Sequence, residues 1–291
     1  MCVVDERVPR VDKVATLRVC EDETIMGVTL LDGRIYVVCF RSNIITVFTS
    51  QQPFRRLQDI VVNGFWSPGD IAASVNVGCL YVIDNPAVWR ISVDNGAVVQ
   101  WLTGLDALTV SVTVEDKVVL LVMVNIQGSW DEHNATWLGE VHVYSSDAVL
   151  ETVIKLSPNI TNPLSIILTT RKTFIVSCGY LWHEVNRVCE VDMTGRVLKA
   201  FGSSPGDGVD QPYNLLHVSL DDQERVIVAD SCNQRVLLLN KQLTSPRVLV
   251  TWHAQLLNDD DDCPVRLHYD RHTGTLLVGL GSGHVDVYKV K

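Results

Sequence analysis

Short apolar runs separated by polar turns dominate the pattern of this chain. The clearest unit is residues 225–240, RVIVADSCNQRVLLLN, in which two apolar runs flank the polar stretch 230–233. Runs of about four to eight residues rich in β-branched side chains and bounded by turn residues are typical of β-strands, so this unit predicts a hairpin. No stretch combines helical periodicity with helix-capping residues. The pattern therefore predicts an all-β protein.

Weaker copies of this unit recur along the chain. Each copy contains up to four short apolar runs, and hairpin signals such as Asp32-Gly33 separate some of them. The second runs of successive copies begin about 40 to 55 residues apart, a period typical of β-propeller blades. We therefore predict one propeller domain over residues 1–291, with blades at about 25–62, 70–103, 107–156, 163–202, 212–252 and 263–290.

Two irregularities at the ends of the repeat determine the number of blades. The last copy has only three apolar runs, whereas residues 13–20, KVATLRVC, form an alternating strand with nothing before it to pair with. If residues 13–20 join the edge of the last copy, the ring closes and no sheet edge stays open. The pattern therefore predicts a six-bladed β-propeller in which each blade is a four-stranded antiparallel sheet.

The best-preserved copy carries a recognisable motif, ADSCNQRV, at residues 229–236. This motif resembles the NHL repeat, a family of six-bladed propellers. The family pattern is an apolar run that ends in Ala-Asp, a small turn, Asn-His-Arg and a further apolar strand. The preceding residues 201–212, FGSSPGDGVDQP, resemble the lead-in of the same repeat. Gln234 and Cys232 depart from the His and Gly that are usual in the family.

The resemblance implies a structural role for the polar residues of the repeat turns. An Asp in this place accepts backbone N–H bonds across the turn, as Asx side chains do. Other copies diverge, since Cys39, Cys178 and Leu280 stand where the Asp is expected. The residues with this expected turn-stabilising role are Asp84, Asp230, Asn233 and Arg235.

The resemblance also implies a class of function. NHL propellers mostly bind proteins or RNA, often as the C-terminal module of RING/B-box (TRIM-type) ubiquitin ligases. We therefore expect a non-catalytic, protein-binding scaffold that recruits substrates to a ubiquitin-ligase-type assembly. The chain has no RING or B-box pattern of cysteines and histidines, so it corresponds to a monomeric recruiting domain that is compatible with a longer protein. An RNA-binding NHL propeller is the first alternative, and a metal-dependent hydrolase or lyase of the six-bladed type is the second.

Charge bears on the choice between a protein and an RNA partner. The net charge of −10, from 24 Lys and Arg against 34 Asp and Glu, opposes contact with phosphates. RNA binding would therefore need a local basic patch. The acidic run 259–262 lacks the ligand spacing of a calcium loop, and we interpret it as a solvated loop. The expected partner is a basic protein.

The termini and the cysteines bear on location. Residues 1–20 are charged and contain no apolar segment of a secretory signal, and no apolar run is long enough to span a membrane. No cysteines form a CxxC pair, which disfavours zinc. We therefore expect a cytoplasmic protein with no cofactor or metal and with reduced, mostly buried thiols. The cysteines are Cys2, Cys20, Cys39, Cys79, Cys178, Cys189, Cys232 and Cys263.

Aromatic and histidine side chains in the loops are the candidates for partner binding. In a propeller, the connections between second and third strands share a face with the connections between blades. The longest second-to-third connections are expected in the third and fourth copies, at residues 125–139 and 179–186. Aromatic residues in such loops often mark partner contacts, although they can instead cover blade edges. The candidates are Phe65, Trp66, Trp130, His133, Trp137, Tyr180, Trp182 and His183.

The predicted innermost strands bear on the enzyme alternative. Lactonase-type and lyase-type propellers bind a metal through convergent acidic, amide or histidine side chains near the ring axis. Here the polar residues of these strands are mainly Ser and Thr, with Asp70, His217, Arg266 and His268 widely spaced. Small hydroxyls suit the narrow centre of a propeller without a catalytic site, so we expect this protein not to be an enzyme.

Overall fold

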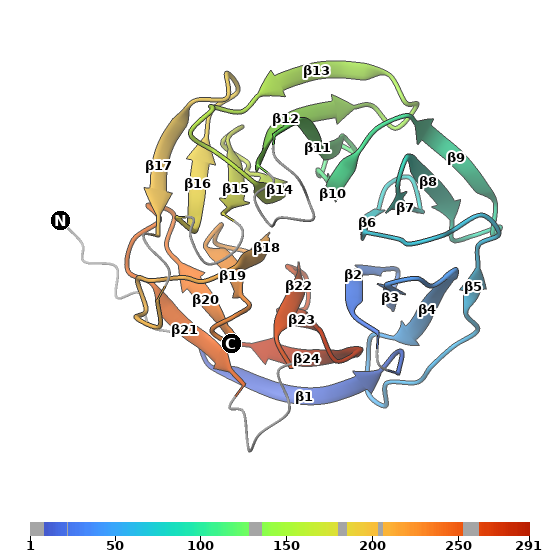
Figure 1. The fold of residues 1–291 in the computed structure, drawn as a ribbon. Helices are drawn as coiled ribbons and strands as arrows, with labels where there is room; N and C mark the ends of the chain where they lie inside the picture. The colour runs from blue at the N-terminus through green and yellow to red at the C-terminus, as the bar shows by residue number, and fades with distance from the viewer. Residues whose placement is uncertain (1–8, 22, 128–135, 180–184, 203–205, 253–261) are drawn as a thin grey trace.

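The strands form a ring of six antiparallel sheets. The computed structural model describes residues 9–21, 23–127, 136–179, 185–202, 206–252 and 262–291. Within these ranges there are 24 strands in six four-stranded sheets, and no helix long and apolar enough to cross a membrane. The sheets stand as blades around a common axis (Figure 1). The prediction of an all-β, six-bladed propeller is confirmed.

In every blade the strands follow one another from the axis outward. Blades 1 to 3 comprise β2 (Ile25–Leu31), β3 (Arg34–Cys39), β4 (Ile44–Thr49) and β5 (Ile60–Val61); β6 (Asp70–Ser74), β7 (Cys79–Asp84), β8 (Ala87–Ser92) and β9 (Val98–Thr103); and β10 (Ala107–Val112), β11 (Val118–Gln127), β12 (Thr136–Tyr144) and β13 (Leu150–Lys155). Blades 4 to 6 comprise β14 (Pro163–Leu168), β15 (Phe174–Cys178), β16 (Arg187–Val191) and β17 (Val197–Phe201); β18 (Leu215–Leu220), β19 (Val226–Asp230), β20 (Arg235–Leu239) and β21 (Arg247–Thr251); and β22 (Pro264–Asp270), β23 (Thr275–Leu280), β24 (His284–Val290) and β1 (Val11–Arg18).

The N-terminal strand closes the ring. β1 pairs antiparallel with β24, with Leu17 opposite Val285, so the outermost strand of blade 6 comes from the other end of the chain (Figure 1). Leu17 is 5% exposed and belongs to the apolar cluster between blades 6 and 1. Lys13 pairs with the buried carboxylate of Asp286 at 2.8 Å. The predicted pairing of the N-terminal strand with the last blade is confirmed, and the strand lies at residues 11–18 where the sequence predicts 13–20.

Apolar clusters fill the spaces between neighbouring blades. Between blades 1 and 2, Tyr36 and Ile45 belong to the same cluster as Leu80 and Trp89. Corresponding clusters occupy the other spaces around the ring. Because both faces of a blade are covered, every residue of β7 and β19 is buried. This double burial explains why the second strands are continuous apolar runs without alternation.

The outer strand of blade 1 differs from the prediction. The sequence predicts a strand over residues 55–62, but the structure has only β5 at Ile60–Val61 and an isolated bridge between Phe48 and Arg56. The guanidinium of Arg56 pairs with Asp59 at 2.7 Å. Residues 57–59 between the bridge and β5 belong to no strand, so the prediction of one continuous strand is wrong.

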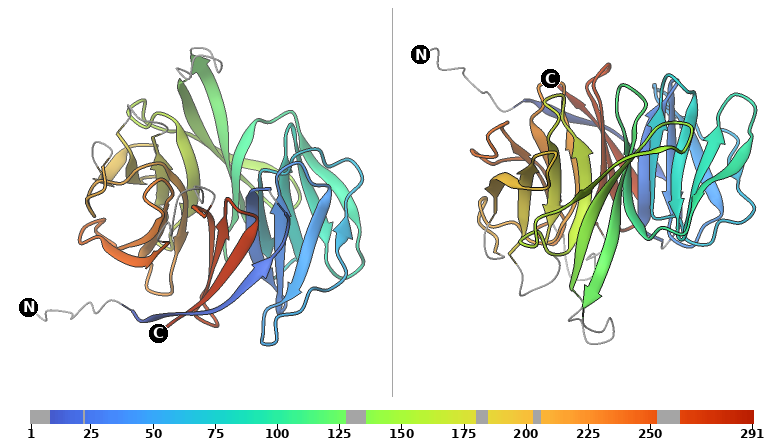
Figure 2. Two further views of the ribbon diagram at one scale, coloured as in Figure 1. Left: turned by 60° about the horizontal axis from the view of Figure 1, so that its bottom comes forward. Right: turned by 90° about the horizontal axis from the view of Figure 1, so that it is seen from above.

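At both ends of the second-to-third connection of blade 3, the described residues belong to strands, where the sequence predicts a loop over residues 125–139. β11 and β12 continue their ladder as far as Gln127 opposite Thr136. Figure 2 shows this green hairpin projecting beyond the ends of the other blades. The strands thus extend three residues beyond Val124 and four residues before Glu140, where the sequence-based connection begins and ends. Residues 128–135 lie outside the described part of the chain.

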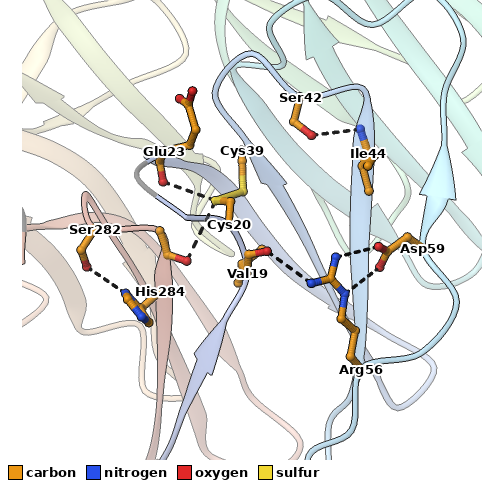
Figure 3. The surroundings of a disulfide bond; sticks show 11 residues. Val19, Cys20, Glu23, Cys39, Ser42, Ile44, Arg56, Asp59, Ser282 and His284 are labelled. Atoms are coloured by element: carbon orange, nitrogen blue, oxygen red, sulfur yellow. Dashed lines mark hydrogen bonds and ion pairs between the residues drawn. A yellow bond between two sulfur atoms is a disulfide. The ribbon is translucent and has the colours of Figure 1, made fainter.

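Two cysteines contradict the expectation that all thiols are reduced. Cys20 and Cys39 form a disulfide across a sequence separation of 19 residues. The bond forms because the segment between β1 and β2 lies beside the end of β3 (Figure 3), a proximity that cysteine spacing does not reveal. Among the other described cysteines, burial is as expected for Cys79, Cys178 and Cys189, whereas Cys263 is half-buried and Cys232 is exposed.

Candidate interaction surface

The structure describes three of the eight aromatic and histidine residues predicted to contact a partner. Since neighbouring strands are antiparallel, the second-to-third connection of a blade and the segment leading into its first strand lie at the same end of that blade. We call the latter the lead-in segment. The three are Phe65, Trp66 and Trp137. The other five lie outside the described residues: Trp130, His133, Tyr180, Trp182 and His183.

Phe65 and Trp137 are packing residues. Phe65 is 8% exposed and meets the ring of Trp89 edge-on, with ring centroids 5.7 Å apart. Trp137 is buried, and its indole nitrogen donates to the carbonyl oxygen of Pro163 at 3.3 Å. The backbone nitrogen of Trp137 donates to Asn162 Oδ1 at 2.8 Å, which ties blade 3 to the lead-in segment of blade 4. These two rings are therefore not available to a partner.

Trp66 has the opposite arrangement. Its side chain is 83% exposed, yet its backbone nitrogen donates to Asp84 Oδ2 at 3.0 Å. The next nitrogen, that of Ser67, donates to Asp84 Oδ1 at 2.6 Å. Gly64 has φ +110 and approaches Trp89 so closely that a Cβ there would lie 3.0 Å from the indole. A fixed backbone therefore presents an indole to solvent.

The turn between β3 and β4 lies next to this segment. Phe40 is 36% exposed, and the guanidinium carbon of Arg41 lies 4.9 Å from the centre of its ring, a cation–π contact. The carbonyl oxygen of Asn43 accepts from the backbone nitrogen of Val62 at 2.9 Å, which joins the turn to the lead-in segment of blade 2. We call Phe40, Arg41 and Trp66 the blade 1 contact surface. The sequence-based candidates did not include Phe40 and Arg41, because their turn is short.

The motif residues of blade 5 organise the lead-in segment of that blade. Asp230 is fully buried, and its carboxylate accepts from the backbone nitrogen of Tyr213 at 2.7 Å and from Arg235 Nε at 2.6 Å. Asn233 Nδ2 donates to the same carboxylate and to the carbonyl oxygen of Gly206 at 3.0 Å. Burial raises the pKa of Asp230, and these donors oppose the shift. The backbone donors to Asp230 and Asp84 thus come from the lead-in segments, whereas the sequence-based expectation placed them across the repeat turn.

Polar side chains of the innermost strands join one blade to the next. Asp70 Oδ2 accepts from the backbone nitrogen of Val110 at 2.9 Å. Ser165 and Ser219 accept from the backbone nitrogens of Val218 and Tyr269, each at 3.3 Å. Neighbouring innermost strands belong to different sheets, so these side chains supply hydrogen bonds that no ladder provides. Asp70, Ser165 and Ser219 therefore have structural partners at the axis.

Arg266 connects three blades near the axis. Its guanidinium donates to the carbonyl oxygens of Met26 at 2.6 Å, Val265 at 2.9 Å and Gly69 at 3.0 Å. Its Nε lies 4.0 Å from Asp70 Oδ1. Burial raises the pKa of Asp70 to about 6, although the charge of Arg266 opposes the shift.

Two histidines lie close to this arginine. His217 Nδ1 accepts from the backbone nitrogen of Leu267 at 3.4 Å. Burial lowers the pKa of His217 well below its usual value, with a further contribution from Arg266, and burial lowers the pKa of His268 to about 4. Both imidazoles are therefore neutral at pH 7. Among the described residues, no group of three or more His, Cys, Asp or Glu side chains is arranged to hold a metal ion.

A cavity at the foot of the blade 3 hairpin was not predicted from the sequence. Its volume is about 430 Å³. The cavity is lined by the apolar residues Val124, Leu138, Leu156 and Pro158 and by the charged residues Glu140, Lys155 and Arg196, among others. It depends on the turn after β16 reaching the end of β13, where Ser157 donates its backbone N–H to Gly195 at 2.9 Å. This contact between blades 3 and 4 leaves no signal in either strand alone.

The fold has a counterpart among solved structures. A crystal structure of a protein of unknown function from Bacteroides caccae is similar over 84% of this chain and 81% of that chain, with a TM-score of 0.57 and 13% sequence identity. At this identity the likeness concerns the fold alone. No family model matches the sequence. No curated protein matches it either. The fold defines the class of protein as a six-bladed β-propeller, an architecture suited to protein interaction.

Proposed function

We propose that this propeller is a non-catalytic scaffold that binds a protein partner through the blade 1 contact surface. The observation that carries the proposal is the exposed indole of Trp66 above a backbone that Asp84 holds. Binding energy in interfaces concentrates in a few residues, among which Trp and Arg are enriched. A side chain on a fixed backbone loses little conformational entropy when it is covered. Arg41, stacked on Phe40, adds a second residue of this kind.

The charge of the chain supports a basic partner. The net charge is −10, and an acidic surface accelerates the approach of a basic protein in a way that salt weakens. In this proposal an apolar or aromatic group of the partner covers Trp66. Basic groups of the partner then meet a protein whose net charge is negative. The association rate is expected to fall as ionic strength rises.

The motif at residues 229–236 supports a finer proposal. Asp230, Asn233 and Arg235 form one hydrogen-bonded cluster, as expected if the motif is retained for its role in an NHL-type blade. On this basis we propose a relationship to NHL propellers, a cytoplasmic location and recruitment of substrates to a ubiquitin-ligase-type assembly. Detection of ubiquitin-ligase subunits with the purified chain tests this finer proposal.

Comparison of two surface variants tests the contact surface. Trp66→Ala removes the exposed indole, and Val114→Ala is the control, because Val114 is 76% exposed in the connection at the opposite end of the ring. Each variant is expected to change the free energy of unfolding by less than about 0.5 kcal/mol. Affinity purification with quantitative mass spectrometry should show partners that Val114→Ala retains and Trp66→Ala loses. Partners retained by both variants contradict the proposal. Tight, salt-sensitive RNA binding by the purified protein would favour the RNA alternative.

A further inference from the structure

The Cys20–Cys39 disulfide occupies a repeated position of the fold. Cys39 is the last residue of β3, as Asp84 is of β7 and Asp230 is of β19. In blades 2 and 5 these carboxylates accept backbone hydrogen bonds from the lead-in segments, at Trp66 and Tyr213. In blade 1, Cys39 is bonded to Cys20, which lies in the lead-in segment between β1 and β2. A covalent bond thus replaces the carboxylate contact of blades 2 and 5.

We propose that this disulfide is a redox-controlled latch for the blade 1 contact surface. Phe40 and Arg41 directly follow Cys39 in the chain. Cys39 ends the β2–β3 ladder opposite Ile25, and the disulfide adds a covalent link from the start of their turn to the lead-in segment. The carboxylates of blades 2 and 5 bind their lead-in segments whatever the redox conditions. In blade 1 the two cysteines are bonded to each other only in the oxidised protein. The inference rests on the proposed function, because it concerns the regulation of the same surface.

Few other bonds join this turn to its lead-in segment. Phe40 donates its backbone N–H to the carbonyl oxygen of Thr24 at 2.9 Å. From farther along the blade, Arg56 reaches the carbonyl oxygen of Val19 at 3.5 Å (Figure 3). Thiols are weak donors and weak acceptors, so after reduction Cys20 and Cys39 form no strong bond in place of the disulfide. The turn is therefore expected to open more often in the reduced protein.

The turn transmits this change to Trp66 through the backbone. Asn43, at the end of the turn, accepts from the nitrogen of Val62, and Phe65 donates its N–H back to the carbonyl oxygen of Val62 at 3.3 Å. The lead-in segment of blade 2 therefore shares a hydrogen-bonded chain with the turn. Asp84 still holds Trp66, so the largest change is expected at Phe40 and Arg41.

The exposure of Cys20 and Cys39 decides which sulfur atom a reducing thiolate attacks first. Cys20 is half-buried and Cys39 is 4% exposed. The thiolate of glutathione, a tripeptide thiol, attacks Cys20 Sγ; the S–S bond breaks, and Cys39 leaves as a thiolate that takes a proton from water. A second glutathione thiolate attacks the mixed disulfide and releases oxidised glutathione and the Cys20 thiolate, which is then protonated. The glutathione pair is oxidised by two electrons and the protein disulfide is reduced by two.

In the proposed cytoplasmic location, the disulfide would respond to changes in the redox state of the cell. Cytosolic thiols are kept reduced, and the disulfides found there are usually transient or redox-sensing. In that compartment the blade 1 contact surface would be ordered under oxidising conditions and loosened under reducing ones. Binding of the partner would then follow the redox state of the cell.

Hydrogen exchange measured by mass spectrometry tests the latch without a partner. The wild-type protein is compared in oxidised and in reduced glutathione, with attention to a peptide spanning residues 37–46. Reduction is expected to accelerate exchange at Phe40 and its neighbours about tenfold, which corresponds to about 1.4 kcal/mol of local opening. A peptide spanning residues 226–239 of blade 5 is the internal control and should not change.

Two double variants make the test specific. Cys20→Ser with Cys39→Ser should exchange like the reduced protein in both buffers. Cys20→Ser with Cys39→Asp places in blade 1 the aspartate found in blades 2 and 5. This variant should retain protection from hydrogen exchange, and its exchange should be the same in oxidised and in reduced glutathione. Equal exchange of the oxidised and reduced wild-type protein would overturn the latch. The same conclusion follows if alkylation shows both cysteines free in oxidised glutathione.

The latch and the proposed function fail in different ways. If reduction changes exchange at Phe40 while Trp66→Ala keeps its partners, the latch is supported and the proposed function is wrong. If Trp66→Ala loses its partners while exchange does not respond to reduction, the function stands and the latch is wrong.

Discussion

Asp84 Oδ2 accepts a hydrogen bond from the backbone nitrogen of Trp66 at 3.0 Å. A carboxylate that is 5% exposed thus holds the backbone beneath an indole that is 83% exposed. The two roles are separable, since the carboxylate contributes to the stability of the blade and the ring is left for contacts outside the molecule.

Removal of this carboxylate should cost stability. Asp84→Ala leaves the backbone donors of Trp66 and Ser67 without their acceptor, and hydrogen bonds to a charged group contribute about 1.5–3 kcal/mol. Urea unfolding should show a loss in this range. Asp94→Ala, at an exposed carboxylate in the turn after β8, is the control. Equal losses in the two variants would contradict the assigned role of Asp84.

The closing strand should be needed for the stability of the whole ring. Leu17 of β1 is 5% exposed between blades 6 and 1, and Leu→Ala at such sites costs about 2–5 kcal/mol. We expect Leu17→Ala to lower the urea midpoint strongly and Arg18→Ala, at its exposed neighbour, to change it little. Deletion of residues 1–18 should destabilise more than either, because it also reopens the edge of β24. An unchanged melting temperature of the truncated protein would refute ring closure by β1.

Arg266 and Asp70 should show energetic coupling. Arg266→Met removes three backbone hydrogen bonds and leaves Asp70 buried beside a neutral group, which costs about 3–5 kcal/mol. Asp70→Asn removes the buried charge. The double variant is therefore expected to lose less than the sum of the single losses, with a coupling of about 0.5–3 kcal/mol in urea unfolding. Additive losses would show that the 4.0 Å separation carries no interaction.

His268 should make the protein sensitive to acid. Its pKa is about 4 in the fold and about 6.5 in an unfolded chain. Between these values the unfolded state binds more protons, so the free energy of unfolding falls as the pH falls through this window, by on the order of 3 kcal/mol for this group. Asp70 acts in the opposite direction, because its pKa of about 6 in the fold lies above its ordinary value.

The contribution of His268 can be isolated by substitution. Urea unfolding at pH 7 and pH 4.5 should give a smaller difference for His268→Gln than for the wild-type protein. His272→Gln, at an exposed histidine in the turn after the same strand, should behave like the wild type. An unchanged pH dependence in His268→Gln would show that its burial does not control acid stability.

The candidate site shows where inference from the sequence was sufficient and where it was not. The loop 63–69 was correctly singled out for its aromatic residues, but the sequence could not distinguish Phe65 from Trp66. Trp89, on the third strand of blade 2, covers Phe65, whereas Asp84 holds only the backbone of Trp66, whose side chain is exposed. The partners of these two neighbouring residues lie about 20 residues away in the chain, so local composition carries no record of them.

By itself, the sequence determined the strand period, the count of blades and the closing role of the N-terminal strand. These features are local, because each blade repeats its own apolar runs and turns, and the missing strand of blade 6 matches the unpaired run at residues 13–20. Only the tertiary structure decided that Cys39 meets Cys20, that Trp66 faces solvent and that Arg266 joins three blades. Each of these depends on contacts between segments that the ring brings together, and such contacts follow from the geometry of closure rather than from the repeat.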